Sequence, residues 1–120
     1  MSDLLIVDDD PGVRAVLRRA LGLAGLPARF AVDGRQALAL ADQRWPAVVL
    51  LDLTLPGDLD GWATWASLER VAQGRPLAVV VWTGDGLAAA EARQRGAVAL
   101  LKSAPPAQVV AVLARGGGSG

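Results

Sequence analysis

A regular alternation of short apolar runs with helical patterns constrains the fold of this chain more than any other feature of its sequence. Four of the runs are apolar at every position, and a fifth run is weaker. The four are Leu4–Val7, Val48–Leu51, Leu77–Val81 and Val98–Leu101, and the weaker run is Ala28–Val32. Because continuous apolar runs are typical of strands that are covered on both faces, the pattern predicts a buried parallel sheet.

A helical pattern follows each of these runs. Asp10 is suited to cap the first helix, Pro11 to start it and Gly25 to end it. The second helix is predicted to begin at Asp33-Gly34 and to bury Ala37, Leu38 and Ala41, and the others to span about residues 61–72, 86–95 and 105–115. Alternating strands and helices predict an α/β domain with right-handed crossovers and helices on both faces of the sheet.

The alternation accounts for one domain over residues 1–115. A chain of 120 residues, 52% hydrophobic and 20% charged, has the length and composition of a single folded domain. The remaining residues, 116–120, read Gly-Gly-Gly-Ser-Gly, which predicts a flexible tail or the start of a linker.

The absence of certain residue types excludes several kinds of chemistry. The chain has no Cys and no His, which excludes disulfides, thiolate or imidazole catalysis and a Cys- or His-ligated metal. Twelve basic residues balance twelve acidic ones, whereas nucleic-acid-binding domains usually carry a basic excess. No apolar run approaches the roughly 18 residues of a membrane span, and the N-terminus lacks the basic start of a secretory signal. We therefore expect a cytoplasmic domain that contacts neither nucleic acid nor membrane.

Polar residues stand where four of the predicted strands end. Since ligands of open parallel sheets bind at the carboxyl ends of the strands, we expect these residues to lie along one edge. They are Asp8 and Asp9 after the first run, Asp52 after the second, Thr83 after the third and Lys102 after the fourth. Mg²⁺ relieves the repulsion between clustered carboxylates, and it prefers carboxylates, water and phosphate oxygens as ligands. Asp52, on the central strand, is the best candidate for a nucleophile that forms an aspartyl phosphate.

Four segments of the sequence resemble the receiver domain of bacterial response regulators. They are LLIVDDDPGVR, AVVLLDLTLPGDLDG, VVVWTGDG and GAVALLKSAPP, in the family's order and spacing, and the resemblance covers residues 3–115. It implies a flavodoxin-like, doubly wound sheet of five parallel strands in the order 2-1-3-4-5 with five helices. It also implies a signalling domain of a two-component phosphorelay rather than an enzyme.

The resemblance assigns roles to the residues at the strand ends. It implies that Asp52 accepts a phosphoryl group from the phosphohistidine of a sensor histidine kinase or a phosphotransfer protein. Thr83 matches the switch hydroxyl that moves toward the phosphoryl group, and Lys102 matches the lysine that pairs with it. Mg²⁺ is implied to bind Asp8, Asp9, Asp52 and the main-chain carbonyl of Thr54. The fourth helix, fifth strand and fifth helix are implied to form a homodimer or to contact an effector.

Departures from the family pattern bear mainly on signal propagation. Ala99 stands where the family often has an aromatic switch residue, so the usual coupling between hydroxyl and aromatic ring is not expected. Ser103 follows Lys102 where proline with a cis bond is common, and we expect a trans bond because a non-proline cis bond is costly. Trp82 is larger than the common aliphatic residue before Thr83. The loop from Pro56 is one residue longer than usual.

Two other functions are compatible with parts of this pattern. A haloacid-dehalogenase-like phosphatase also uses an aspartyl phosphate, but it would need an aspartate at position 54, where this chain has Thr54. A phosphorylation-independent interaction module could keep the fold without the switch.

On the first helix, Arg14 and Arg18 lie one turn apart near the acidic cluster, and the resemblance suggests kinase docking there. The four tryptophans are predicted to lie in or near the core and are given no binding role.

Overall fold

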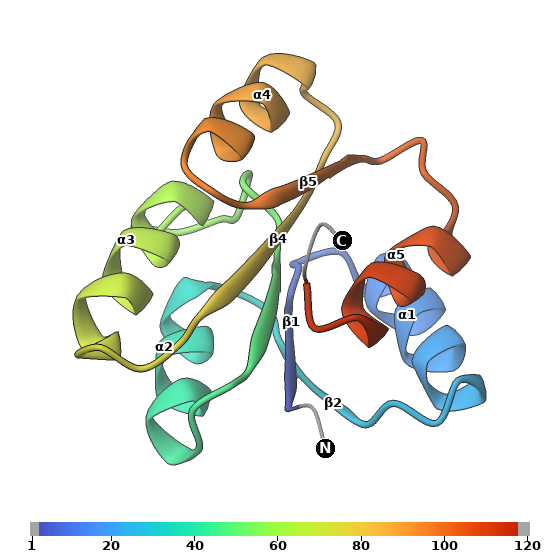
Figure 1. The fold of residues 1–120 in the computed structure, drawn as a ribbon, viewed down its shortest axis with the longest axis horizontal. Helices are drawn as coiled ribbons and strands as arrows, with labels where there is room; N and C mark the ends of the chain where they lie inside the picture. Colours follow the sequence, from blue (N-terminus) through green and yellow to red (C-terminus); the bar gives the residue numbers. More distant parts are fainter. Residues whose placement is uncertain (1–2, 118–120) are drawn as a thin grey trace.

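The computed structural model describes residues 3–117, which form five parallel strands and five helices. The strands are β1 (Leu4–Val7), β2 (Ala28–Ala31), β3 (Val48–Leu51), β4 (Ala78–Thr83) and β5 (Val98–Leu101). The helices are α1 (Pro11–Leu23), α2 (Gly34–Gln43), α3 (Gly61–Ala72), α4 (Gly86–Gln94) and α5 (Pro106–Ala114). Every strand pairs in parallel with its neighbours in the order β2-β1-β3-β4-β5 (Figure 1). This confirms the predicted fold and strand order.

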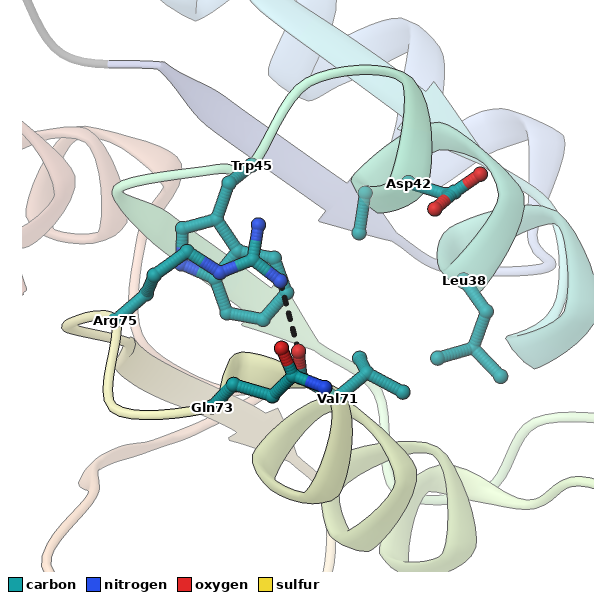
Figure 2. A pocket seen from close by; sticks show the side chains of 7 residues that line it. Leu38, Asp42, Trp45, Val71, Gln73 and Arg75 are labelled. Atoms are coloured by element: carbon teal, nitrogen blue, oxygen red, sulfur yellow. Dashed lines mark hydrogen bonds between the residues drawn. The ribbon is translucent and has the colours of Figure 1, made fainter.

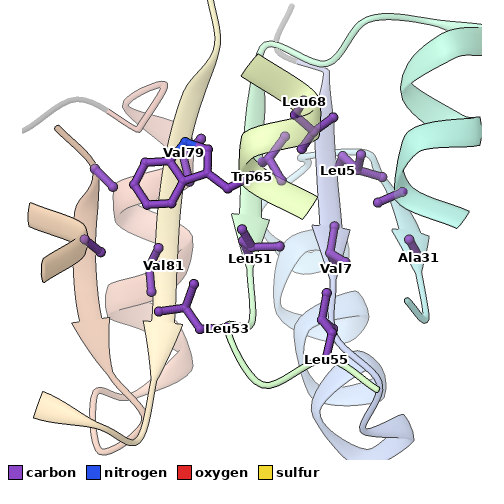
Figure 3. Close-up of a cluster of buried hydrophobic side chains, with 14 of the residues drawn as sticks. Leu5, Val7, Ala31, Leu51, Leu53, Leu55, Trp65, Leu68, Val79 and Val81 are labelled. Atoms are coloured by element: carbon purple, nitrogen blue, oxygen red, sulfur yellow. The ribbon is translucent and has the colours of Figure 1, made fainter. Parts of the chain in front are cut away.

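The helices cover the two faces of the sheet in unequal groups, with α1 and α5 on one face and α2, α3 and α4 on the other (Figure 1). Each face has its own hydrophobic cluster. The larger cluster includes Val7, Leu51, Leu68 and Val81 (Figure 3), and the smaller cluster includes Leu17, Val80, Trp82 and Val109. Because side chains alternate along each strand, the central strands contribute to both clusters. The apolar runs β1 and β3 are buried along their whole length, as predicted.

The fully apolar run at β5 is only partly covered, contrary to the prediction. Val98 and Leu100 are partly exposed, and Leu101 is 41% exposed. The physical reason is topological, because β5 is an edge strand with only β4 beside it. Composition predicts that a segment forms a strand, but the number of its neighbours decides how much of it is buried.

Aspartate side chains begin four of the five helices. Asp10, Asp33, Asp60 and Asp85 each accept a hydrogen bond from a backbone N–H in the first turn of α1, α2, α3 and α4. These N–H groups have no partner within the helix, so a carboxylate oxygen accepts their hydrogen bonds. The negative charge of the carboxylate also interacts favourably with the positive N-terminal end of the helix dipole. The predicted cap at Asp10 is confirmed, with its Oδ1 2.8 Å from the Gly12 nitrogen.

The end of α1 is as predicted, because Leu23 is its last residue and Gly25 follows the C-cap with a left-handed backbone (φ +71°). Other element ends differ from the prediction by one or two residues: β4 begins at Ala78 and extends through Thr83, and α5 begins at Pro106, with Pro105 at the N-cap position. At the end of α5, the Gly117 N–H donates to the Val112 carbonyl at 3.0 Å. Gly117 has a left-handed backbone (φ +73°), which glycine adopts without strain. Residues 118–120 of the predicted tail lie outside the described residues.

Candidate functional site

The strand register brings the polar residues that follow the strands to one edge of the sheet. Val7 pairs with Leu51 across β1 and β3, so the residues that follow them, Asp8 and Asp52, are neighbours. The Asp52 N–H donates to the Val7 carbonyl at 3.0 Å, which holds the two strand ends together. Parallel strands point the same way, so their carboxyl ends share an edge, as predicted.

Three carboxylates meet at this edge. Asp8, Asp9 and Asp52 each place one carboxylate oxygen within 4.8 Å of the others. Asp8 is 4% exposed and Asp52 is 7% exposed, whereas Asp9 faces solvent. Burying carboxylates side by side is unfavourable unless a cation or hydrogen-bond donors compensate their charge. We refer to these three residues as the acidic cluster.

Lys102 compensates part of that charge. Its Nζ lies 2.9 Å from Asp8 Oδ2, and the lysine side chain is 31% exposed while that of Asp8 is 5% exposed. The other oxygen of Asp8 accepts the Asp10 N–H at 2.9 Å. The main chain of Lys102 is fixed too, because its N–H donates to the Thr83 carbonyl at 2.8 Å. The structure thus brings Lys102, predicted from the end of β5, into direct contact with the acidic cluster.

Asp52 makes hydrogen bonds with the loop that follows it. Its Oδ1 accepts the Thr54 backbone N–H at 3.0 Å and the Thr54 hydroxyl at 2.9 Å. Both donors hold one oxygen of the carboxylate and fix its orientation. Among the residues that the structure describes, no protein donor is hydrogen-bonded to Asp52 Oδ2. The two carboxylate oxygens are therefore inequivalent.

Thr83 ends β4 beside this edge and is 2% exposed. Its Oγ1 accepts the Asp85 N–H at 3.2 Å, so the hydroxyl proton remains available for another acceptor. Ala99 on β5, at the position of the aromatic switch, is 4% exposed and packs in the larger cluster. The small methyl group of Ala99 offers no ring that could move behind Thr83.

Within residues 3–117 no peptide bond is cis, so the bond between Lys102 and Ser103 is trans as expected.

The basic face of α1 is held by two specific contacts. Arg14 donates from its Nη1 to the Asp8 carbonyl at 3.0 Å, which fastens the first turn of α1 to the end of β1. The Arg18 guanidinium stacks over the Phe30 ring at 4.4 Å from its centroid. Arg14 therefore lies beside the acidic cluster, whereas Arg18 contacts β2, and each arginine also contributes to the fold.

The loop between β3 and α3 is braced against α2. Arg35 makes a two-point ion pair with Asp58, with Arg35 Nε 3.0 Å from Asp58 Oδ1. The hydrogen bonds from Arg35 hold the pKa of the Asp58 carboxyl below its usual range. At the end of this loop Gly61 starts α3, and a Cβ there would lie 2.3 Å from the Leu53 Cα. Only glycine allows α3 to begin so close to the segment that carries Asp52.

A cavity of about 340 Å³ lies elsewhere, at the opposite edge of the sheet (Figure 2). It lies between the C-terminal ends of α2 and α3. Arg75 stacks over Trp45 at 4.2 Å from the ring centroid and donates to the carbonyls of Ala72 and Val71. The donors of Arg75 are therefore used to close the end of α3, and the cavity has no part in the acidic cluster.

Three contacts at the site were not predicted from the sequence. The Trp82 ring lies 4.5 Å from Lys102 Nζ, the Thr54 hydroxyl bonds to Asp52, and Arg14 bonds to the Asp8 carbonyl. The unusual size of Trp82 was the one available signal for the first. The other two depend on side-chain directions that become visible only in the fold.

Comparison with known families identifies the domain. The family model of the response regulator receiver domain matches residues 4–114. The chain belongs to the response regulator receiver domain family. This confirms the resemblance drawn from the four sequence segments. Within residues 3–117, no helix is long and apolar enough to cross a membrane.

Two curated relatives that the chain matches are longer proteins. The chain is 32% identical over 109 residues to the C4-dicarboxylate transport transcriptional regulatory protein DctD of Pseudomonas aeruginosa, covering 91% of this chain and 23% of DctD. It is 38% identical over 116 residues to the transcriptional activator protein ExaE of Pseudomonas putida, covering 93% of this chain and 53% of ExaE. The chain thus spans about a quarter of DctD and about half of ExaE.

Solved receiver domains share the fold over nearly the whole chain. The receiver domain of NtrX from Brucella abortus superposes with a TM-score of 0.85 at 32% identity, covering 98% of this chain and 100% of that one. The chemotaxis protein CheY4 of Vibrio cholerae gives a TM-score of 0.82 at 26% identity, covering 96% of this chain and 98% of that one. The fold is therefore shared over at least 96% of this chain.

Proposed function

We propose that this receiver domain accepts a phosphoryl group on Asp52 from the phosphohistidine of a histidine kinase or phosphotransfer protein, in a reaction that requires Mg²⁺. The observation that carries the proposal is the acidic cluster, in which three carboxylate oxygens lie within 4.8 Å of one another beside Lys102. Phosphoryl transfer depends mainly on positioning and on neutralising charge, and this edge of the sheet supplies both.

The residues at this edge fit a magnesium ion. The donor set consists of hard carboxylate oxygens without nitrogen or sulfur ligands, which is the chemistry that Mg²⁺ prefers. Asp8, Asp9 and Asp52 would hold the ion, together with the main-chain carbonyl of Thr54, and of the acidic pair the resemblance assigns the more direct contact to Asp9 rather than to Asp8. When bound, the ion would neutralise the carboxylates and the oxygens of the incoming phosphoryl group.

Asp52 is the proposed nucleophile. Its Oδ1 is held by the two hydrogen bonds from Thr54, which leaves Oδ2 as the oxygen for attack on phosphorus. A bond forms between Oδ2 and phosphorus as the bond between phosphorus and the donor's imidazole nitrogen breaks. The imidazole leaves with the electron pair and takes up a proton from solvent. The product is an aspartyl phosphate on Asp52 and a free histidine on the donor.

Lys102 and Thr83 are proposed to bind the transferred group. The Lys102 ammonium already lies against the acidic cluster and needs only to exchange Asp8 for a phosphoryl oxygen. The Thr83 hydroxyl can donate its proton to another phosphoryl oxygen. We propose that this movement alters the face formed by α4, β5 and α5, through which the domain would dimerise or contact an effector. Because Ala99 carries no ring, the change must reach that face by another route.

The domain is proposed to act as a signalling switch and not as a phosphatase with turnover. Thr54 stands where a haloacid-dehalogenase-like enzyme would need a second aspartate, and its hydroxyl bonds to Asp52. Such a residue cannot serve as general acid or base for a leaving group at neutral pH. Turnover of small phosphate esters is therefore not expected.

Intact-mass measurement tests the proposal. The purified protein is incubated with acetyl phosphate, with and without Mg²⁺, beside Asp52→Asn and the matched control Asp42→Asn, an exposed aspartate on α2. We expect a single phosphoryl adduct on the wild type and on the control, absent from Asp52→Asn and absent without Mg²⁺. A folded wild type without an adduct at any Mg²⁺ concentration would instead favour a phosphorylation-independent interaction module.

A further inference from the structure

Trp82 directly precedes Thr83 on β4 and contacts Lys102 of the neighbouring strand end. It is 6% exposed, although tryptophan is rarely buried so completely. On the face of the sheet covered by α1 and α5, Trp82 packs in the smaller cluster with Val80 and Val109. The strand register pairs Trp82 with Leu100 of β5, so Lys102, two residues further on, lies on the same face.

Two contacts join Trp82 to Lys102. The Lys102 ammonium lies 4.5 Å from the centroid of the indole ring, within the distance of a cation–π interaction. The indole N–H donates to the Leu101 carbonyl at 3.0 Å, and this carbonyl belongs to the peptide unit just before Lys102. Trp82 therefore contacts both the backbone that carries Lys102 and the charged end of its side chain.

The position of the ammonium follows from these contacts. It lies 2.9 Å from Asp8 Oδ2 while also resting against the ring. A lysine side chain has a flexible stem of four carbons and loses about 2 kcal/mol of rotamer entropy when it is held in one conformation. A buried ring against the ammonium reduces the conformations that the side chain can adopt before any phosphoryl group arrives.

We propose that Trp82 is a positioning residue that holds the Lys102 ammonium against the acidic cluster, ready to bind the phosphoryl group on Asp52. The inference rests on the proposed function and deepens it. Among the described residues, the polar and cation contacts of Trp82 are with the Leu101 carbonyl and the Lys102 ammonium, so we expect it to act through Lys102. This gives the bulky residue before Thr83 a role that packing alone does not require.

Nuclear magnetic resonance tests the contact in the unphosphorylated protein. An aromatic ring shifts protons that lie over its face upfield, so the Lys102 Hε protons are expected upfield in the wild type. The shift should remain in Trp82→Phe and disappear in Trp82→Leu. Equal Lys102 shifts in the wild type and Trp82→Leu would overturn the placement of the ammonium, whatever the fate of the phosphorylation proposal.

A kinetic cycle tests the consequence. The rate of adduct formation with acetyl phosphate and Mg²⁺ is measured for the wild type, Trp82→Leu, Lys102→Met and the double variant. We expect Trp82→Leu to slow adduct formation about 5- to 30-fold, the size of a partly buried cation–π contact. In the Lys102→Met background the same change should have no further effect, since a residue that acts through Lys102 loses its effect with it.

Two controls separate positioning from packing. Trp82→Phe keeps an aromatic face against the ammonium but loses the N–H bond to Leu101, and its rate should stay within about threefold of the wild type. Trp45→Leu removes a ring from a cation contact at the opposite edge and should leave the rate unchanged. The inference would be overturned if Trp82→Leu lowered the rate of adduct formation by the same factor in the wild type and in the Lys102→Met variant. No adduct on the wild type would instead refute the proposed function.

Discussion

Neutralising Asp9 should stabilise the metal-free domain, although it removes a residue proposed to bind Mg²⁺. Asp9 faces solvent, and its carboxylate lies within 4.8 Å of those of Asp8 and Asp52. Two like charges 4.8 Å apart repel by about 0.9 kcal/mol in a medium as polar as water. Attraction to the nearby Lys102 and screening by salt offset part of the two repulsions, so Asp9→Asn should raise the free energy of unfolding by about 1 kcal/mol.

Urea or thermal unfolding at low ionic strength with a chelator measures this difference. For a domain of this length about 1 kcal/mol corresponds to a rise of about 4 °C in the unfolding temperature. Magnesium should reverse the order, because the wild type gains about 2.7 kcal/mol at an ion concentration 100 times its dissociation constant and the variant gains less. Asp42→Asn, outside the cluster, serves as the control in both buffers.

Either of two results would refute the reasoning. If Asp9→Asn unfolds more easily than the wild type without metal, the three carboxylates do not repel as their spacing requires. If Mg²⁺ stabilises the wild type, Asp9→Asn and Asp42→Asn equally, the ion does not bind through Asp9. Both readouts are equilibrium measurements and need no phosphoryl donor.

Three further substitutions test other parts of the structure. Gly61→Ala should destabilise the domain by about 3 kcal/mol or more in urea unfolding, because its Cβ would lie 2.3 Å from backbone that cannot move. Asp58→Asn should lower the unfolding temperature at neutral pH, and this difference should vanish in acid. The hydrogen bonds from Arg35 lower the pKa of Asp58 in the folded protein, so the pair stabilises the fold above the unfolded-state pKa. That stabilisation is lost as the pH falls through the folded-state pKa of Asp58. Thr54→Val should cost about 1 kcal/mol of unfolding free energy and still allow adduct formation, since the backbone N–H continues to hold Asp52.

The acidic cluster could be predicted from the sequence because its geometry follows from topology alone. Once β1 and β3 are parallel neighbours, the residues that follow Val7 and Leu51 must lie side by side. No knowledge of side-chain conformation is needed for that step. The same argument placed Lys102 at the correct edge.

What the sequence could not show depends on side-chain direction and on neighbours. The contact of Trp82 with Lys102 requires that both lie on one face and that the lysine bends over the ring. The hydroxyl of Thr54 could have faced solvent, and it instead bonds to Asp52. The exposure of Leu101 reflects the edge position of β5; the apolar run itself does not encode this position, although the strand order implied by the resemblance does.

The stacking of Arg18 on Phe30 affects how the kinase docking on α1 that the resemblance suggests should be tested. A charge reversal at Arg18 changes the docking surface, but it also removes the cation that joins α1 to β2, so slower transfer would have two explanations. Arg19, its exposed neighbour, has the same charge, and the described residues give it no ion pair. Reversing Arg19 would therefore test for long-range attraction to a kinase, and comparing the two variants separates recognition from the integrity of the helix.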